Sequence, residues 1–190
     1  MVKLDILAVG NLKRDEDGSI LEAHSTSTMV RTDDRIIVVD TSSKFLRPAI
    51  KSSLRDLGVF AKDVDTVVLT HWHSDHVENL DMFPNAKVYL HAGCPKISQK
   101  YEEVTEDMDL CPGVRLVHTP GHTHDSMSVF VKADRNYVIA GDAIPLEDNY
   151  RKKVPPALNY DRVAAMESIK SIVRFADVIV PGHGFPFMTK

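Results

Sequence analysis

Apolar and polar residues alternate with a period of two along residues 3–9, which predicts a half-buried strand at the start of the chain. Two further apolar runs, at 26–32 and 35–39, flank the turn residues Asp33 and Asp34. Residues 11–18 are polar and rich in turn formers, so we expect a loop there. The first forty residues therefore predict an antiparallel start built from strands and a hairpin.

The pattern then changes to a mixture of helices and strands. Residues 45–57 carry apolar side chains at helical spacing before Gly58, and Asp161 is placed to cap a helix that continues to about Phe175. A shorter helix is expected at 77–83. Short apolar runs predict strands at 64–69, 87–90, 114–117, 127–131, 137–140 and 178–180. This order favours a mixed α/β (α+β) fold of layered sheets covered by helices, formed as a single domain by residues 1–190.

Composition limits the classes of partner. The chain has 190 residues, 43% of them hydrophobic and 26% charged, with a net charge of −4. This balance gives no general attraction to nucleic acid or to an anionic membrane. No run is long enough to cross a bilayer, and Asp5 interrupts the apolar residues at the N-terminus, which argues against a signal peptide. We expect a cytoplasmic protein that acts on a small molecule; a homo-oligomer remains open.

The two cysteines, Cys94 and Cys111, form neither a CxxC pair nor a disulfide framework. Two reduced thiols are the expected state in the cytosol. Because each cysteine lies beside a proline in an expected loop, a disulfide between them stays an alternative.

The densest group of chemically active side chains follows the apolar strand predicted at 64–69. His71, His73, Asp75 and His76 stand within six residues. In an extended segment His71 and His73 point to the same side, and a following helical turn can aim Asp75 and His76 at a neighbouring point. Imidazole and carboxylate are ligands of zinc and iron, so this spacing predicts two adjacent metal sites.

Three more fragments place one ligand-type residue each in a glycine-containing turn after a strand. They contain His122 in Pro-Gly-His, Asp142 after Gly141, and His183 in Pro-Gly-His-Gly. Loops held at strand ends by a rigid sheet are common places for functional residues.

In this order, HxHxDH and the three later fragments resemble the motifs of the metallo-β-lactamase superfamily over nearly the whole chain. The resemblance implies a four-layer αββα sandwich with two divalent metal ions at one edge of its sheets, zinc above all, with iron or manganese as alternatives. It implies that the first metal is held by His71, His73 and His122 and the second by Asp75, His76 and His183.

The same resemblance makes Asp142 the bridge between both metals, and it places Asp40, which matches the family's first motif, behind the ligands. Many relatives have glycine where this chain has Ser42. The resemblance implies a hydrolase that uses a metal-bridging hydroxide on an ester, thioester, lactone, amide or phosphodiester, with Asp75 and Asp142 as the catalytic carboxylates.

Two alternatives belong to other classes. A mononuclear non-haem iron dioxygenase would use only His71, His122 and Asp142, and a non-catalytic protein would use metal for stability or binding. The complete second set of ligands argues against both.

Outside the ligand set, a few residues are candidates for contact with substrate. His24 precedes a strand and His124 follows the third motif closely. Arg151, Lys152 and Lys153 lie in the segment between Asp142 and the last helix, where they are placed to attract an anionic substrate.

Overall fold

The computed structural model describes residues 1–95 and 100–189. Its strands form two six-stranded sheets and a separate two-stranded hairpin. The first sheet has the order β1-β4-β5-β6-β7-β8 and comprises Lys3–Ala8, Ser27–Arg31, Ile36–Val39, Thr66–Val68, Lys87–His91 and Glu102–Val104. The second has the order β14-β13-β12-β11-β10-β9 and comprises Phe187–Met188, Val178–Pro181, Asn136–Gly141, Met127–Lys132, Val114–His118 and Met108–Cys111.

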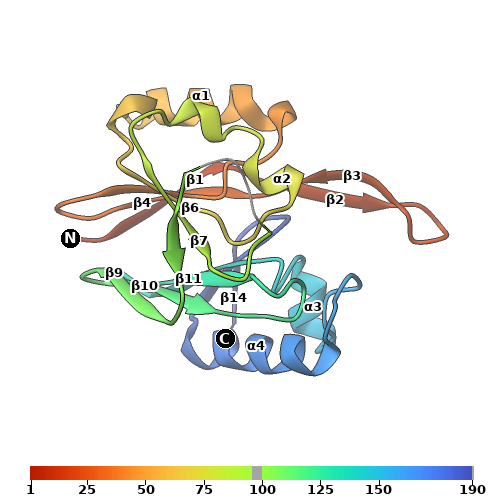
Figure 1. Cartoon of the computed structure of the whole chain (residues 1–190). Helices are drawn as coiled ribbons and strands as arrows, with labels where there is room; N and C mark the ends of the chain where they lie inside the picture. The colour runs from red at the N-terminus through yellow and green to blue at the C-terminus, as the bar shows by residue number, and fades with distance from the viewer. Residues whose placement is uncertain (96–99, 190) are drawn as a thin grey trace.

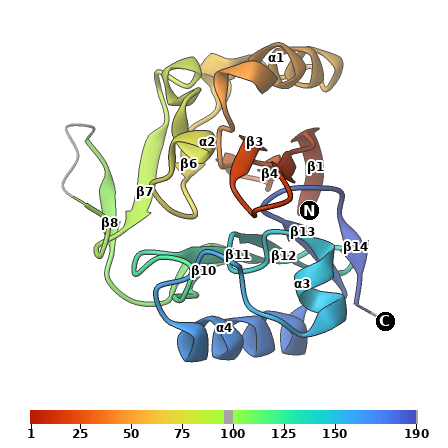
Figure 2. The ribbon, with the colours of Figure 1, turned by 90° about the vertical axis from the view of Figure 1, so that its right-hand side faces the viewer.

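The two sheets lie face to face between two helices (Figure 1). Helix α1 (Arg47–Asp56) covers the outer face of the first sheet, and α4 (Arg162–Phe175) covers that of the second. Two shorter helices, α2 (Ser74–Val77) and α3 (Glu147–Lys152), lie in the connections near the site described below. Short 3₁₀ turns occur at Lys44–Leu46, Ala61–Asp63 and Leu80–Met82. This is the predicted αββα sandwich, and the turned view separates its four layers (Figure 2).

Each pair of layers encloses its own apolar core. Ile50 and Leu54 of α1 are buried against the first sheet. Valines and leucines of both sheets fill the space between them. Ile169 and Ile172 of α4 pack on the second sheet. A fully buried side chain of this size stabilises the fold by about 1.5–3 kcal/mol, so the sandwich is a rigid frame for the loops at its edge.

The long helices begin and end close to where the sequence predicts. Oδ1 of Asp161 accepts hydrogen bonds from the backbone N–H groups of Val163 and Ala164, at 2.8 and 2.9 Å, which confirms the predicted cap of α4. Helix α1 begins at Arg47 rather than Phe45, whose ring is exposed, and ends before Gly58 at a φ of 69°.

Several short elements differ from the prediction. Residues 11–18, expected as a loop, contain strand β2 (Asn11–Arg14), which pairs with β3 (Ile20–His24) in a hairpin that projects from the sandwich (Figure 1). The helix expected at 77–83 is divided into α2 and a 3₁₀ turn. The segment between Asp142 and the last helix, for which no helix was predicted, contains α3, where Glu147 pairs with Arg151 and Asp148 with Lys152 at i,i+4.

Strand direction decides where the functional loops gather. Strands β10 and β12 are both antiparallel to β11 and therefore run the same way, and β13 is parallel to β12. Their carboxyl ends consequently meet at one edge of the second sheet. A backbone hydrogen bond of 2.8 Å from Met127 to Thr70 ties this edge to the segment that follows β6 in the first sheet.

Candidate metal centre

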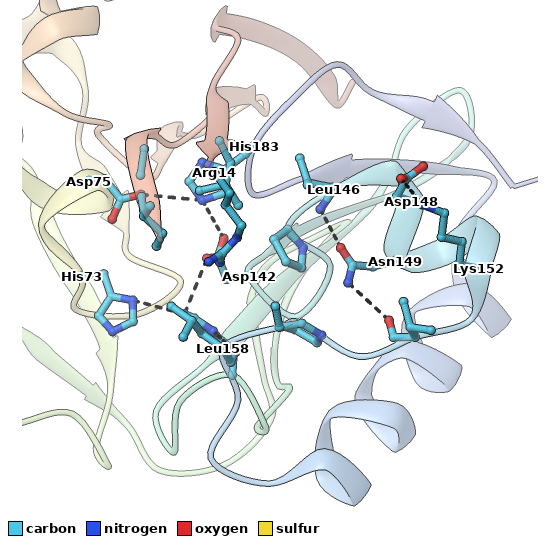
Figure 3. A pocket seen from close by; sticks show the side chains of 18 residues that line it. Arg14, His73, Asp75, Asp142, Leu146, Asp148, Asn149, Lys152, Leu158 and His183 are labelled. Carbon is cyan, nitrogen blue, oxygen red and sulfur yellow. Dashed lines mark hydrogen bonds and ion pairs between the residues drawn. The ribbon is translucent and has the colours of Figure 1, made fainter. Parts of the chain in front are cut away.

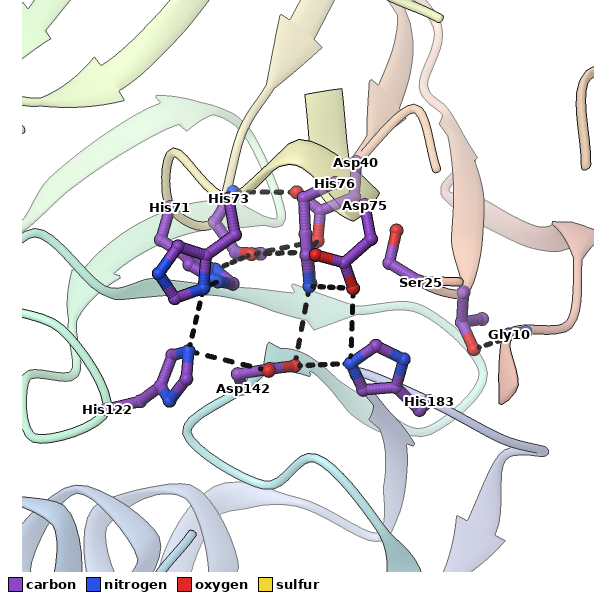
Figure 4. A network of polar contacts seen from close by, with 12 residues as sticks. Gly10, Ser25, Asp40, His71, His73, Asp75, His76, His122, Asp142 and His183 are labelled. Atoms are coloured by element: carbon purple, nitrogen blue, oxygen red, sulfur yellow. Dashed lines mark hydrogen bonds and ion pairs between the residues drawn. The ribbon is translucent and has the colours of Figure 1, made fainter. Parts of the chain in front are cut away.

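All seven side chains predicted as metal ligands come together at this edge (Figure 4). The segment after β6 and the start of α2 supply four of them, and the ends of β10, β12 and β13 supply the others. Those from the first half are His71, His73, Asp75 and His76, and those from the second half are His122, Asp142 and His183.

Three imidazoles form the first group. Nε2 of His71 lies 2.9 Å from Nδ1 of His73, and Nε2 of His122 lies 3.1 Å from the same Nδ1. His71 and His122 are buried, whereas His73 is exposed. Three nitrogen atoms that converge in this way are a suitable set of ligands for one transition metal.

A second group lies beside it and contains one carboxylate. Oδ2 of Asp75 lies 3.7 Å from Nε2 of His76 and 3.6 Å from Nε2 of His183. The three ligand atoms are within 4.8 Å of one another. Both histidines are buried, and Asp75 is partly open to solvent.

Asp142 stands between the two groups. Its Oδ1 lies 3.3 Å from Nε2 of His183 and 3.5 Å from Nε2 of His76. Its Oδ2 instead lies 3.5 Å from Nε2 of His122. Each oxygen of one carboxylate thus faces a different group of ligands, which is the arrangement that a bridging ligand requires.

Backbone carbonyls orient two of the histidines from behind. Nδ1 of His122 donates to the carbonyl oxygen of Leu158 at 2.8 Å. Nδ1 of His183 donates to the carbonyl oxygen of His24 at 2.9 Å. With its proton held on Nδ1, each ring directs the lone pair of Nε2 into the site.

Asp40 plays the same part for His76 and also holds the chain that leaves β6. Its Oδ2 accepts from Nδ1 of His76 at 2.8 Å and from Oγ1 of Thr70 at 2.8 Å. Its Oδ1 accepts from the backbone N–H of Thr70 at 2.8 Å. The Thr70 hydroxyl lies 3.1 Å from Nδ1 of His71, so one buried carboxylate organises both ligand groups.

The turn that carries Asp40 has an unusual backbone. Asp40 and Ser42 have φ angles of 53° and 58°, in the left-handed region that favours glycine. A glycine would adopt this φ without strain, whereas Ser42 donates a hydrogen bond of 2.7 Å to the carbonyl of Ser25.

Glycine allows the close approach of the loops from the second sheet. A Cβ atom on Gly182 would lie 2.0 Å from Oδ1 of Asp142, and one on Gly141 would lie 2.5 Å from Oγ1 of Thr70. A larger residue at either position would displace a carboxylate or hydroxyl that shapes the site.

Burial and charge shift the pKa values of the ligands in opposite directions. Burial and the neighbouring His76 hold the pKa of His71 well below 6.5. Burial also opposes protonation of His76, but Asp40 and Asp142 together raise its pKa well above 6.5. Although burial favours the neutral acid, His183 and His76 hold the pKa of Asp142 well below 3.8. Against burial, Asp142 raises the pKa of His183.

The donor set fits a bound cation. Nε2 of His76 and Oδ1 of Asp142 are buried without a hydrogen-bond partner among the described residues. Leaving such atoms unpaired is costly, and a metal ion would satisfy both. Nitrogen and carboxylate ligands suit zinc, iron or manganese.

Comparison with known proteins agrees with this geometry. The sequence profile of the metallo-beta-lactamase superfamily matches residues 22–105 and 99–183. The chain belongs to the metallo-beta-lactamase superfamily. A probable metallo-hydrolase of Methanocaldococcus jannaschii is 37% identical over 182 residues, which cover 96% of this chain and 87% of the relative.

More distant proteins share the fold. An N-acyl homoserine lactonase from a Bacillus species is 26% identical over 139 residues, covering 65% of this chain and 55% of the lactonase. A Thermotoga maritima structure assigned to the metallo-beta-lactamases superposes with a TM-score of 0.81 at 21% identity, covering 98% of this chain and 99% of that one. This chain thus belongs to a family of metallo-hydrolases and carries a candidate metal site of histidines and aspartates.

A cavity of about 240 Å³ opens beside the candidate metal ligands (Figure 3). Side chains of the projecting hairpin and of the segment 145–158 form its walls, and most of these are apolar. The polar members of the wall are Arg14, Asp148, Asn149 and Lys152. Arg14 donates one hydrogen bond, of 2.7 Å, to the carbonyl of Gly18.

The predicted substrate contacts are divided between several places. Lys152 lines the cavity, with its Nζ 2.7 Å from Oδ2 of Asp148. Arg151 and Lys153 lie on the other side of α3, along a groove against α4.

The two candidate histidines lie next to the centre. The ring of His24 stacks on Phe45 at 4.6 Å, and its Nδ1 lies 2.6 Å from Oγ of Ser43. Its backbone carbonyl, rather than its ring, holds His183. The ring of His124 lies at an angle of 32° to that of Tyr160, with 3.5 Å between the centroids, in a second recess that is also lined by His73.

Sequence reasoning missed three contributors. The carbonyl of Leu158 has no side-chain signal at all. Thr70 could have been suspected, because a hydroxyl residue directly precedes the ligand motif. Arg14 lies in the hairpin that was expected as a loop, and nothing in the sequence indicates that its side chain lines the cavity.

The cysteines are both free. Cys94 packs in the core beneath α1, where its Sγ donates to the Tyr101 hydroxyl at 3.3 Å, whereas Cys111 ends β9 against the core between the sheets. Burial raises the pKa of both thiols. The expected thiols are confirmed, and the alternative disulfide is not formed. Among the described residues no helix has the length and apolar character to cross a membrane.

Proposed function

We propose that this protein is a dinuclear metal-dependent hydrolase. The observation that carries the proposal is the position of Asp142, whose two oxygens face two separate groups of three ligands. We propose zinc as the metal, because these groups consist of imidazole nitrogens and carboxylate oxygens. Two such ions would supply a nucleophilic water at neutral pH and polarise the oxygen of the scissile group.

The chain's own residues would position and hold the reacting groups. Asp75 is the partly exposed carboxylate of the centre, so its oxygens can accept a hydrogen bond from the attacking water. His122 and His183 stay fixed by hydrogen bonds from Nδ1 to backbone carbonyls, which keeps the geometry ready before substrate arrives.

The cavity favours a particular kind of substrate. Its mainly apolar walls fit an acyl group, and Arg14 and Lys152 can attract a negative charge on the substrate or product. An ester, thioester or lactone with an apolar acyl part is the class that we propose, and the similarity to a lactonase supports testing lactones first. Phosphodiesters are the alternative class of substrate.

A mononuclear iron dioxygenase is the competing function. Such an enzyme would need His71, His122 and Asp142 and could function without His183. The second group of ligands, with its own buried histidines, supports the dinuclear reading. We also propose a cytoplasmic location, which the two free thiols favour.

The deciding experiment compares wild type with His183→Ala. We expect about two metals per chain in wild type by elemental analysis, fewer in the variant, and a large loss of hydrolysis on a panel of lactones, esters, thioesters and phosphodiesters. Oxygen uptake is measured in parallel, and we expect none that depends on substrate. A single tightly bound iron that survives the substitution and supports oxygen uptake would overturn the hydrolase.

A further inference from the structure

A second hollow lies on the far side of α3 from the metal centre. It is a groove of about 620 Å³ between α3 and α4. Its floor is apolar and is formed by Tyr150, Met166, Ile169 and Val173. The floor residues of α4 lie one and two turns apart on the same face, so this floor extends about 10 Å along the helix axis.

The rim of the groove is entirely basic. The charged residues that line it are Arg151, Lys153, Lys170 and Arg174, and no acidic side chain joins them in the wall. Two of these cations are partly neutralised, because Arg151 pairs with Glu147 and Lys170 with Glu167. Among the described residues, Lys153 and Arg174 form no ion pair, and both are exposed.

Helix α3 separates this groove from the catalytic cavity. Asp148, Asn149 and Lys152 line the cavity, whereas Tyr150, Arg151 and Lys153 line the groove. Figure 3 shows the first three residues on the cavity side of the helix. The basic groove is therefore separate from the cavity. Arg151 and Lys153 do not line the cavity, so binding of a substrate at the metal centre does not account for them.

We propose that the groove between α3 and α4 binds a single-chain anionic amphiphile, with its apolar tail on the floor and its carboxylate at the basic rim. The occupant follows from two complementary features. An apolar floor gains from covering by an alkyl chain, and unpaired cations at its edge gain from a negative head group. A cationic or neutral amphiphile would satisfy only the first requirement, and a small anion only the second.

The groove also gives the amphiphile a short connection to the metal centre. Asn149 is buried and accepts from the backbone N–H of Leu146 at 3.2 Å, while its side-chain amide donates to the carbonyl of Pro155 at 3.0 Å. Both ends of the segment that forms the cavity wall are thereby tied to α3.

Decanoate is the probe. All proteins in this test carry Asp142→Ala, which removes the proposed bridge between the metals and so limits binding of the decanoate carboxylate at the metal centre. Binding is measured by isothermal titration calorimetry, with decyltrimethylammonium as the tail without the anion and acetate as the anion without the tail. The test variant adds Lys153→Glu and Arg174→Glu. The matched control adds Lys3→Glu and Lys87→Glu, which reverse two exposed lysines on strands and change the net charge equally.

We expect decanoate to bind, the two other probes to bind far more weakly, and the test variant to lose about tenfold in affinity. The control variant should bind as its parent does. Circular dichroism establishes that each variant is folded. The proposal is overturned if decanoate fails to bind or if decyltrimethylammonium binds equally well. It is also overturned if the test variant loses no more affinity for decanoate than the control variant does. None of these outcomes depends on hydrolysis, so they are distinct from a failure of the proposed function.

Discussion

Oδ2 of Asp40 lies 2.8 Å from Nδ1 of His76, and both side chains are buried. This contact fixes the His76 ring so that Nε2 faces the second ligand group. Asp40→Asn keeps the shape but removes the charge that favours this orientation. We expect the affinity for the second metal to fall about 10- to 100-fold, as is usual for a partner behind a ligand. Competition with a chromophoric chelator measures it.

Asp63→Asn is the control for this variant, because it removes an exposed carboxylate that precedes β6, at the opposite end of this strand from the ligand motif. It should bind both metals as wild type does. Equal metal affinity in wild type and Asp40→Asn would show that His76 is oriented without its carboxylate.

Asp142→Ala tests the bridge. Because both groups of ligands share this carboxylate, we expect lower occupancy of both metals and loss of hydrolysis in a protein that stays folded. Elemental analysis, activity and near-ultraviolet circular dichroism are measured on the same preparation. A variant with full metal and full activity would rule out the bridging role.

Gly182→Ala tests the close approach to the bridge. The added Cβ would meet Oδ1 of Asp142 at 2.0 Å, so the carboxylate or the loop has to move. We expect less bound metal and a lower Tm. Gly18→Ala is the comparison for metal content alone: its φ of 90° strains the backbone, but its Cβ would project into open space, so that variant should keep its metal. Unchanged metal content in Gly182→Ala would mean that the loop yields without consequence.

Metal binding should depend on pH more steeply at the second group than at the first. In the metal-free protein the pKa of His76 is raised above 6.5, so a metal at the second group has to displace a proton even at neutral pH. His71 has a lowered pKa and is already neutral there. Affinity for the second metal should therefore rise with pH through neutrality, by up to about tenfold per unit for each proton released.

The stability of the metal-free protein should move the other way. The raised pKa of His76 contributes stability that is fully present below 6.5 and is lost as pH rises through the folded value. Thermal denaturation with a chelator present, from pH 6.5 upward into the alkaline range, measures this trend, because the opposite contribution from the lowered pKa of His71 is complete above 6.5. A metal-free Tm that rises with pH across this range would contradict it.

Arg14→Gln combined with Lys152→Gln tests recognition of charge in the cavity. For an anionic substrate we expect a higher KM and a weaker dependence on salt, with kcat less affected. Lys13→Gln is the control, because Lys13 neighbours Arg14 in the hairpin but pairs with Glu22. If a neutral analogue loses as much as the anionic substrate, the cations act on the shape of the cavity instead.

The candidate metal ligands and most of the strands and helices could be predicted from the sequence. HxHxDH follows a strand whose apolar run is unmistakable, and each later ligand is marked by a glycine turn after a strand. The long helices show their apolar faces and their ends directly. These features are local, so they can be recognised without knowing how distant segments meet.

What the sequence could not supply depends on contacts between distant segments. The carbonyls of Leu158 and His24 orient ligands through backbone atoms, which have no residue signature. Helix α3 has only six residues, and its i,i+4 charge pairs were the one available sign of it. The direction in which Arg151 and Lys153 lie depends on how α3 packs against α4.

The ligands come from both halves of the sandwich, four from the segment after β6 and three from the edge of the second sheet. Bound metal would thus cross-link, at the ligand end, two layers that the chain joins through the short segment 105–107 between β8 and β9. Removing the metal would free the loops of the two sheets from each other at this end, while leaving each apolar core intact. With metal bound in this way, the apparent stability of the protein would depend on the free metal concentration, and its abundance in the cell would follow the metal supply.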